Sequence, residues 1–311
     1  MRGRGPVSDF AAGESFLYRD ADNTKTTLIP LSWLRHICEG SVSVYLFYTD
    51  ETNLDPAQSD FFVYGGLTVP SDRARQLSEA MDALRTRFGL PPGAMLKFNP
   101  APAGLDHDQF KALKQAVVEL AIEHGCQFIA TLTLHSIARN SDEARRFAIN
   151  TIAYHFDGFL NARGTHGLVL IDRFTDAQLD EQLRDRFAVG VRGLPYSPTM
   201  RLQNIVGFHY AAIGQGHFGS LIDIVLGSFR FAVNAFTRGD EARRQSGDTI
   251  LRLLAPLFIR NDDGRVSGIG LHFSPVAVRA AIYRTQYEAL RTYLAECGIE
   301  ASQQIRAEQV Y

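Results

Sequence analysis

The sequence has few cysteines, no excess of basic charge and no long hydrophobic run. Its three cysteines, Cys38, Cys126 and Cys297, are widely separated, which favours buried thiols in a reducing compartment over a disulfide framework or a zinc site. The formal net charge is -2, so the chain lacks the overall basic field typical of nucleic-acid binding, although a local basic cleft is compatible with a neutral total. No stretch approaches the roughly 18 apolar residues of a membrane span, and the basic N-terminus leads into polar residues. We therefore expect a cytoplasmic protein with no membrane partner.

Several catalytic motifs are also absent. The sequence contains no Gly-x-Ser-x-Gly and no His-Glu-x-x-His, so serine-hydrolase and zinc-protease functions lack support. Gly65 and Gly66 lie inside a strand pattern without a following Gly-Lys-Ser/Thr, which indicates a bulge or a close backbone approach rather than a phosphate loop. With 45% hydrophobic and 21% charged residues, the composition is that of a globular protein with a substantial core.

The hydrophobic periodicity predicts an α/β core. Strands are expected at 42–48, 61–69, 127–134, 166–171 and 204–209, and helices at 71–88, 106–124, 141–161, 176–189 and 218–236. The first two strands are separated by a short loop, which predicts an antiparallel ribbon. The strand at 166–171 is apolar on consecutive positions, as is typical of a central parallel strand. Ser71 and Asp106 are expected to cap their helices.

The predicted organisation is a single elaborated domain, because no internal repeat or long linker interrupts the chain. Residues 1–40 are expected to form an N-terminal extension packed on the core, residues 41–236 the core, and residues 237–311 a C-terminal helical elaboration. Within the elaboration, helices are expected around 248–258 and 275–297, on either side of a polar turn at 261–264. The last helix carries an apolar face that is compatible with a homodimer interface or with packing on the chain's own core. That face comprises Val278, Ile282, Tyr283, Tyr287, Leu290 and Leu294.

Acidic residues stand at the boundaries of the predicted elements. Asp50 and Asp172 each follow an apolar strand, and ligands of open α/β sheets bind in the crevice beyond the strand ends. Asp223 lies among aliphatic residues of a helix, where a charge needs a partner, a hydrogen bond or a metal. If the three carboxylates converge, their oxygens suit Mg²⁺ or Mn²⁺, which could activate a water and stabilise the leaving oxygen of a phosphodiester. Glu51 follows Asp50, but adjacent strand residues point to opposite faces of a sheet.

Ordinary structural roles are the alternatives at each position. Asp50 is compatible with a strand-end turn and Asp172 with the start of a following turn. Asp223 could form a buried ion pair with Arg230, seven residues further along the helix. Lys97, by sequence alone, is an ordinary loop lysine.

Histidines and arginines are further candidates for the same cleft. His135 and His209 follow apolar strands, yet structural histidines are favoured over a proton shuttle or metal ligands. Two arginine groups are candidates for a local basic cleft, with solvated helix faces the favoured alternative. The groups are Arg139, Arg145 and Arg146, and Arg238, Arg243, Arg244 and Arg252.

The order of these motifs resembles the domain of unknown function 3800 family. The resemblance covers about residues 42–236 and rests on Tyr48-Thr-Asp50-Glu51-Thr, on Phe62-Val-Tyr-Gly-Gly-Leu-Thr-Val69, on the isolated Lys97, on Leu170-Ile-Asp172 and on Leu221-Ile-Asp223-Ile-Val-Leu-Gly227. It implies a ribonuclease H-like fold, a mixed sheet flanked by helices, in which acids from the first strand, a central strand and the last helix bind divalent metal for nucleic-acid cleavage.

Carried over by position, the resemblance assigns metal-ligand roles to Asp50, Asp172 and Asp223. Glu51 becomes the adjacent acidic member of the catalytic set, and Lys97 matches a loop lysine that contacts phosphate. A further acid usually comes from the helix before the central strand, for which Glu143 and Asp157 are the candidates.

The chain departs from the family pattern at two places. Thr52-Asn53 replaces Ser-Gly after the acidic pair, and Ser220-Leu-Ile222 replaces Leu-Gln-x-Ala before the helical aspartate. The leading hypothesis is a nuclease that uses Mg²⁺ or Mn²⁺ to cleave RNA or DNA. The alternative is a catalytically silent subunit of the same fold that binds nucleic acid or a protein partner, in an anti-phage defence or mobile-element system.

Overall fold

The computed structural model describes residues 15–19, 26–30, 44–138, 140–172, 185–186, 190–194, 197–211 and 216–308. The chain divides into two compact units, Met1–Val42 and Ser43–Tyr311. The described part of the first unit is an antiparallel pair of β1 (Ser15–Arg19) and β2 (Thr26–Pro30). Packing of this extension on the core stays a prediction.

The second unit is built on a six-stranded mixed sheet in the order β10-β5-β4-β3-β6-β9. Its strands are β3 (Tyr45–Thr52), β4 (Phe61–Pro70), β5 (Gln127–Leu134), β6 (Gly167–Asp172), β9 (Ile205–Ala211) and β10 (Leu271–Ser274). Strand β4 is antiparallel to both of its neighbours, and the other pairings are parallel. A separate antiparallel pair joins β7 (Val191–Leu194) to β8 (Ser197–Met200). The prediction of an α/β fold with a mixed sheet flanked by helices is confirmed.

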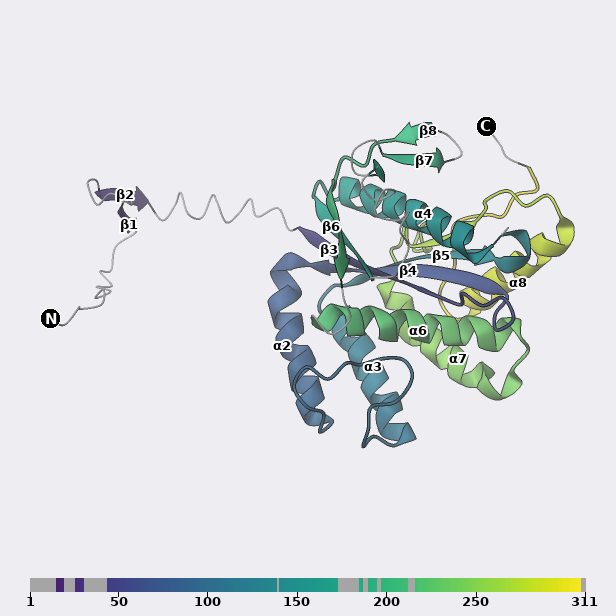
Figure 1. Ribbon diagram of the computed structural model, residues 1–311, viewed down its shortest axis with the longest axis horizontal. Coiled ribbons are helices and arrows are strands. Elements are labelled where there is room, and N and C mark those ends of the chain that lie inside the picture. Colours follow the sequence, from purple (N-terminus) through teal and green to yellow (C-terminus); the bar gives the residue numbers. More distant parts are fainter. Residues whose placement is uncertain are drawn as a thin grey trace. The chain divides into compact units, whose positions relative to one another are not determined.

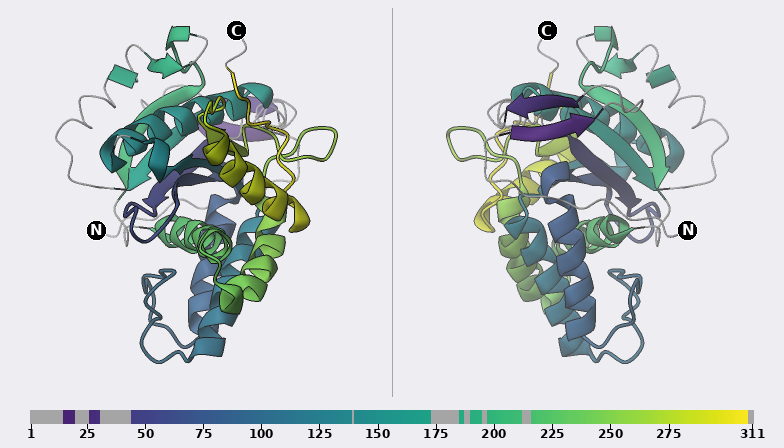
Figure 2. Two further views of the ribbon diagram at one scale, coloured as in Figure 1. Left: turned by 90° about the vertical axis from the view of Figure 1, so that its right-hand side faces the viewer. Right: turned by 90° about the vertical axis from the view of Figure 1, so that its left-hand side faces the viewer.

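Helices cover both faces of this sheet (Figure 1). Helix α4 (Ser141–Ala162) lies on one face, and α2 (Ser71–Arg87), α3 (His107–Glu123), α6 (His217–Thr237) and α7 (Glu241–Leu254) lie on the other, as both views of Figure 2 show. Side chains of β3 alternate between the two layers. Phe47 stacks on Phe156 of α4 at 4.4 Å between ring centroids, and Tyr48 meets Phe218 of α6 edge-on at 5.5 Å.

The two predicted helix caps have different outcomes. Asp106 caps α3 in a capping box, in which its carboxylate accepts from the backbone N–H of Gln109 and the Gln109 side chain accepts from the backbone N–H of Asp106. The prediction for Ser71 is wrong, because Pro70 is the N-cap of α2 and no side chain caps this end. The helix predicted at 176–189 falls almost entirely outside the described residues.

The C-terminal part was predicted least well. Strand β10 was missed, and it extends the main sheet by pairing in parallel with β5, so this part is not purely helical. Helix α7 begins at Glu241 rather than near 248, and α8 (Ala281–Glu296) begins later than the predicted 275. Residue Ala277 forms a β-bridge with Arg306, so pairing with a distant segment keeps the chain extended before α8. The turn at 261–264 is confirmed by a bridge between Arg260 and Val266.

Helix α8 packs on the chain's own core. Tyr287, Leu290 and Leu294 are buried there, whereas Ile282 is 68% exposed. Most of the apolar face that was compatible with a homodimer is therefore already covered within the chain.

Two other sequence-based expectations concern buried groups. Cys126 and Cys297 are buried free thiols, as predicted, and Cys38 lies outside the described residues. The glycine pair marks a close approach, since a Cβ on Gly66 would lie 2.4 Å from the ring of Phe47.

Helix α6 is long and apolar enough to cross a membrane, but 72% of its apolar window is buried inside the protein, as is typical of a core helix.

Candidate functional site

Asp50 and Asp172 lie side by side at one end of the sheet. Strands β3 and β6 are parallel, and their register pairs Thr49 with Ile171, so the two aspartates follow at the same level of adjacent strands. Neighbouring strands are about 4.8 Å apart, and residues at the same level share a face. Both carboxylates lie on the α6 side, because both line a cavity of about 190 Å³ together with Tyr48 and Ile222. The structure thus brings together two of the three carboxylates whose convergence the sequence left open.

Glu51 takes the opposite face of β3. Its carboxylate lies 3.3 Å from the guanidinium of Arg145 on α4, and both side chains are largely buried. Arg145 also pairs with Asp142 at 2.5 Å. Burial raises the pKa of Glu51, and the charge and hydrogen bond of Arg145 oppose that rise. The acidic pair therefore divides between the two helical layers, as the strand geometry predicted.

Asp223 reaches the site from α6 and is held by a loop. One carboxylate oxygen accepts a hydrogen bond of 2.6 Å from the backbone N–H of Phe98. Two residues earlier, the N–H of Leu96 donates to the hydroxyl of Ser220 at 3.0 Å. Ser220 and Asp223 are three residues apart and so lie on one side of the helix, where the extended loop meets both. The hydrogen-bonded partner of the partly buried Asp223 is therefore the backbone N–H of Phe98, and not Arg230.

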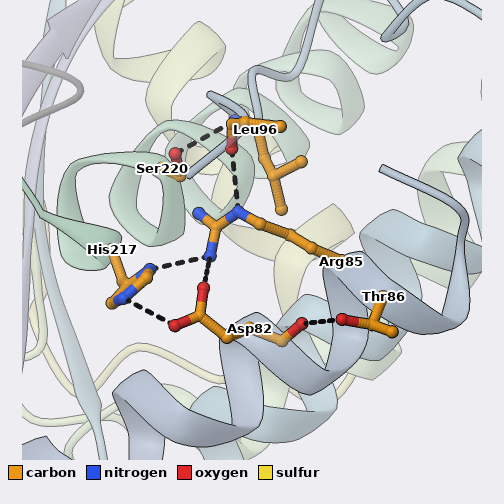
Figure 3. Close-up of polar contacts among 7 residues, drawn as sticks. Asp82, Arg85, Thr86, Leu96, His217 and Ser220 are labelled. Atoms are coloured by element: carbon orange, nitrogen blue, oxygen red, sulfur yellow. Dashed lines mark hydrogen bonds and ion pairs between the residues drawn. The ribbon is translucent and has the colours of Figure 1, made fainter. Parts of the chain in front are cut away.

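A buried arginine fixes the same loop from below (Figure 3). Arg85 of α2 is 2% exposed, and its Nε donates to the carbonyl of Ala94 at 2.8 Å. Its Nη1 lies 2.7 Å from Nδ1 of His217 and 3.3 Å from the carboxylate of Asp82. Asp82 is also 3.4 Å from Nε2 of His217, which closes the network. The first turn of α6, the end of α2 and the loop are thereby held in one arrangement.

Burial and neighbouring negative charge both act on the carboxyl of Asp50. The pKa of its carboxyl rises from 3.8 to about 7, first because of burial and then because of the charges of Glu51, Asp172 and, more weakly, Asp223. The backbone N–H of Glu51, which donates to Asp50 at 2.8 Å, opposes this rise. The carboxylates are thus close enough to destabilise one another's charge, and a bound cation would relieve that repulsion.

The residues present fit a divalent metal in chemistry, and only in part in geometry. Carboxylate oxygens are the ligands that Mg²⁺ and Mn²⁺ prefer, and Asp50 and Asp172 adjoin each other. Among the residues that the structure describes, however, no three acidic, histidine or cysteine side chains lie close enough together to hold one ion. Asp50 and Asp172 are accordingly the pair that would hold a metal, with Asp223 as the nearest further acid from α6.

The remaining predicted residues take separate positions. Lys97 is half-buried in the loop on α6, directly before Phe98. Asp157 accepts from the backbone N–H of Asn204, next to the start of β9 and therefore at the opposite end of the parallel strands from Asp50. Asp157 therefore cannot join the acidic site. Glu143 lies in the first turn of α4.

The two histidines do not share a role. Nε2 of His135 lies 2.8 Å from the carbonyl of Asn53 and 3.2 Å from the hydroxyl of Ser59, so it has a structural role. His209 is exposed on the edge strand β9.

The sequence predicted only part of the lining of a second, basic cavity. It has a volume of about 780 Å³ and includes Arg238 and Arg243 from the second arginine group. Arg244 of that group instead packs against the stacked rings of Phe236 and Tyr293. Arg139 lies outside the described residues. Arg230, which by sequence was an alternative partner for Asp223, also lines the cavity, and its spacing from the C-cap residue Arg238 is the signal that could have placed both on the cavity wall.

No protein-family model matches this chain, and a comparison with curated proteins found no match.

Proposed function

We propose that the protein is a metal-dependent phosphodiester hydrolase acting on RNA or DNA, with a ribonuclease H-like core. The observation that carries the proposal is the side-by-side placement of Asp50 and Asp172 at the ends of parallel strands, in a cavity where the pKa of Asp50 reaches about 7. Carboxyl groups that line a cleft and have strongly shifted pKa values are typical of functional sites.

The origin of the acids supports the same proposal. Asp50 comes from β3, the first strand of the main sheet, Asp172 from β6 and Asp223 from helix α6. This is the order that the resemblance to the domain of unknown function 3800 family implies. One departure from that pattern is explained by the backbone, because Asn53 has a φ of 61°, a conformation that glycine adopts freely and asparagine tolerates.

Each residue has a distinct part in the proposed mechanism. Asp50 and Asp172 would hold Mg²⁺ or Mn²⁺, which when bound activates water and stabilises the leaving oxygen. Asp223 is oriented by the N–H of Phe98, so its carboxylate is fixed before substrate arrives. Glu51, bound to Arg145, contributes through its charge. Lys97 would contact a phosphate of the substrate.

The decisive experiment measures metal-dependent cleavage of labelled RNA and DNA. Asp172→Asn and Asp223→Asn are expected to lower cleavage by at least about 100-fold, since each removes a charge that the metal or the transition state requires. Asp157→Asn, which changes an equivalent carboxylate at the other end of the sheet, is the control and should retain activity. Wild-type activity that survives in both site variants would overturn the proposal.

A catalytically silent binding subunit is the second candidate. It is favoured by one observation, that no three metal-ligating side chains among the described residues lie within reach of one ion. Thermal unfolding with and without millimolar Mn²⁺ separates the two. If the site binds metal, Mn²⁺ should raise the Tm, and Asp50→Asn should abolish this rise. At a metal concentration one hundred times the Kd, the free energy of unfolding is expected to increase by about 2.7 kcal/mol. A silent subunit predicts no metal-dependent shift in either protein.

A further inference from the structure

A basic cavity lies where β3 ends, at Asn53, and along the second half of α6, at Arg230 and Asn234. Its lining includes three arginines against one acidic residue, Asp240, which pairs with Arg243 at 3.4 Å. Neither Arg230 nor Arg238 forms an ion pair with any residue in the described part of the chain. Burial lowers the pKa of Arg230 and the charge of Asp223 opposes this. The cavity therefore presents positive charge without an equal negative charge within its walls.

One face of α6 connects this cavity to the acidic site. Four residues spaced three or four apart form a stripe along the helix, and they are Asp223, Gly227, Arg230 and Asn234. Arg230 lies two turns beyond Asp223, about 10 Å along the axis. Phe98 sits on the middle of the stripe, because a Cβ on Gly227 would lie 2.4 Å from that of Phe98. Negative and positive ends of one stripe are thus separated by a single aromatic side chain.

The basic surface continues past Phe98 into a second cavity of about 460 Å³. Phe98 and Phe231 line both cavities, with ring centroids 6.1 Å apart. The second cavity adds Lys111 and Lys114 against one acidic residue, Asp108, and the ammonium of Lys114 lies 4.3 Å from the centre of the Phe98 ring. Cations therefore flank a pair of aromatic rings on both sides.

We propose that these two cavities, lined by Arg230, Arg238, Lys111, Phe98 and Phe231 among others, form a binding groove for a single-stranded polynucleotide that leads to the acidic site. The inference rests on the proposed nuclease function. Phosphates of the strand are neutralised by the arginines and lysines, and Phe231, which is half-buried, offers a stacking surface to an unpaired base. Stacked bases in a duplex cannot use such a surface, so a single strand is the substrate class.

The test is fluorescence anisotropy with labelled 20-nucleotide DNA and RNA strands and a duplex of the same sequence, in EDTA so that no cleavage occurs. Arg230→Gln/Arg238→Gln is compared with Arg73→Gln/Arg75→Gln, which removes equal charge from the exposed start of α2, away from the C-terminal end of α6 (Figure 1). The groove variant is expected to bind single strands about tenfold more weakly and to lower the slope of log affinity against log salt by about 1.4. The control should bind as wild type does.

Three results would overturn the groove: no binding by wild type, equal binding by the groove and control variants, or duplex binding as tight as that of single strands. Arg238→Glu, which changes an exposed side chain, repeats the test if the double variant is unstable. Cleavage assays with Mn²⁺ keep the two proposals apart. Binding without cleavage would support the groove and contradict the proposed nuclease activity. Cleavage that is unchanged in the groove variants would support the nuclease activity and contradict the groove.

Discussion

The side chains of Asn53 and Asn234 form a reciprocal amide pair, with hydrogen bonds of 2.8 and 3.0 Å in the two directions. Asn53 follows the strand that carries Asp50, and Asn234 lies on the helix that carries Asp223. The pair therefore ties the two acidic elements together at the edge of the basic cavity, which both residues line.

This pair gives the first prediction, which concerns backbone conformation. Asn53→Ala is expected to destabilise the protein by about 1 kcal/mol more than Asn53→Gly, because only the alanine must adopt a positive φ at a cost. Asn234→Ala removes the amide pair without strain and leaves the bond from Asn53 to the carbonyl of Phe61, so it should destabilise no more than Asn53→Gly. Urea unfolding of the three variants checks this. Equal stability of the alanine and glycine variants at position 53 would contradict the backbone argument.

The raised pKa of Asp50 makes stability depend on pH. The pKa is 3.8 in an ordinary carboxyl and about 7 in the fold, so the folded protein binds more protons between these values and loses stability as pH rises through them. The free energy of unfolding of Asp50→Asn should match that of wild type near pH 4. At pH 8 without metal it should exceed the wild-type value by up to about 4 kcal/mol. Thermal unfolding across this range tests it. Asp262→Asn, at an exposed turn, is the control, and a parallel shift in both variants would argue against the burial of Asp50 as the cause.

The close contact between α6 and the loop predicts opposite effects of alanine at two helical glycines. Gly227→Ala forces the new Cβ against Phe98 and should destabilise by about 1–3 kcal/mol while displacing the N–H that binds Asp223. Gly158→Ala in α4 meets nothing closer than 3.5 Å and should stabilise by up to about 1 kcal/mol. Denaturation measures both, and cleavage should fall only in Gly227→Ala.

The buried guanidinium of Arg85 predicts a local as well as a global effect. Arg85→Ala is expected to cost about 2 kcal/mol, below the usual value for a broken buried pair because Asp82 is about half exposed. Limited proteolysis should then cut the loop at 94–98 faster, since the carbonyl of Ala94 loses its donor. Arg87→Ala, on the exposed side of the same helix, should change neither measurement.

Much of the candidate site could be predicted because its signals are local. A β-branched and aromatic run ending in Asp50, and an apolar run ending in Asp172, specify strands whose ends meet at one edge of a sheet. Alternation along β3 likewise separated Glu51 from Asp50. Asp106 was identified as a cap because its partner lies three residues away.

The sequence by itself thus determined the strands, most helices and which acids stand at their ends, because these depend on residues close together in the chain. Tertiary structure alone decided the rest. Strand β10 has four residues and exists because β5 offers it a pairing edge. Asp223 is oriented by Phe98, and the basic cavity unites Arg230 with Asn53, through contacts between segments more than 100 residues apart. No local pattern encodes such contacts, since they form only when the whole core has packed.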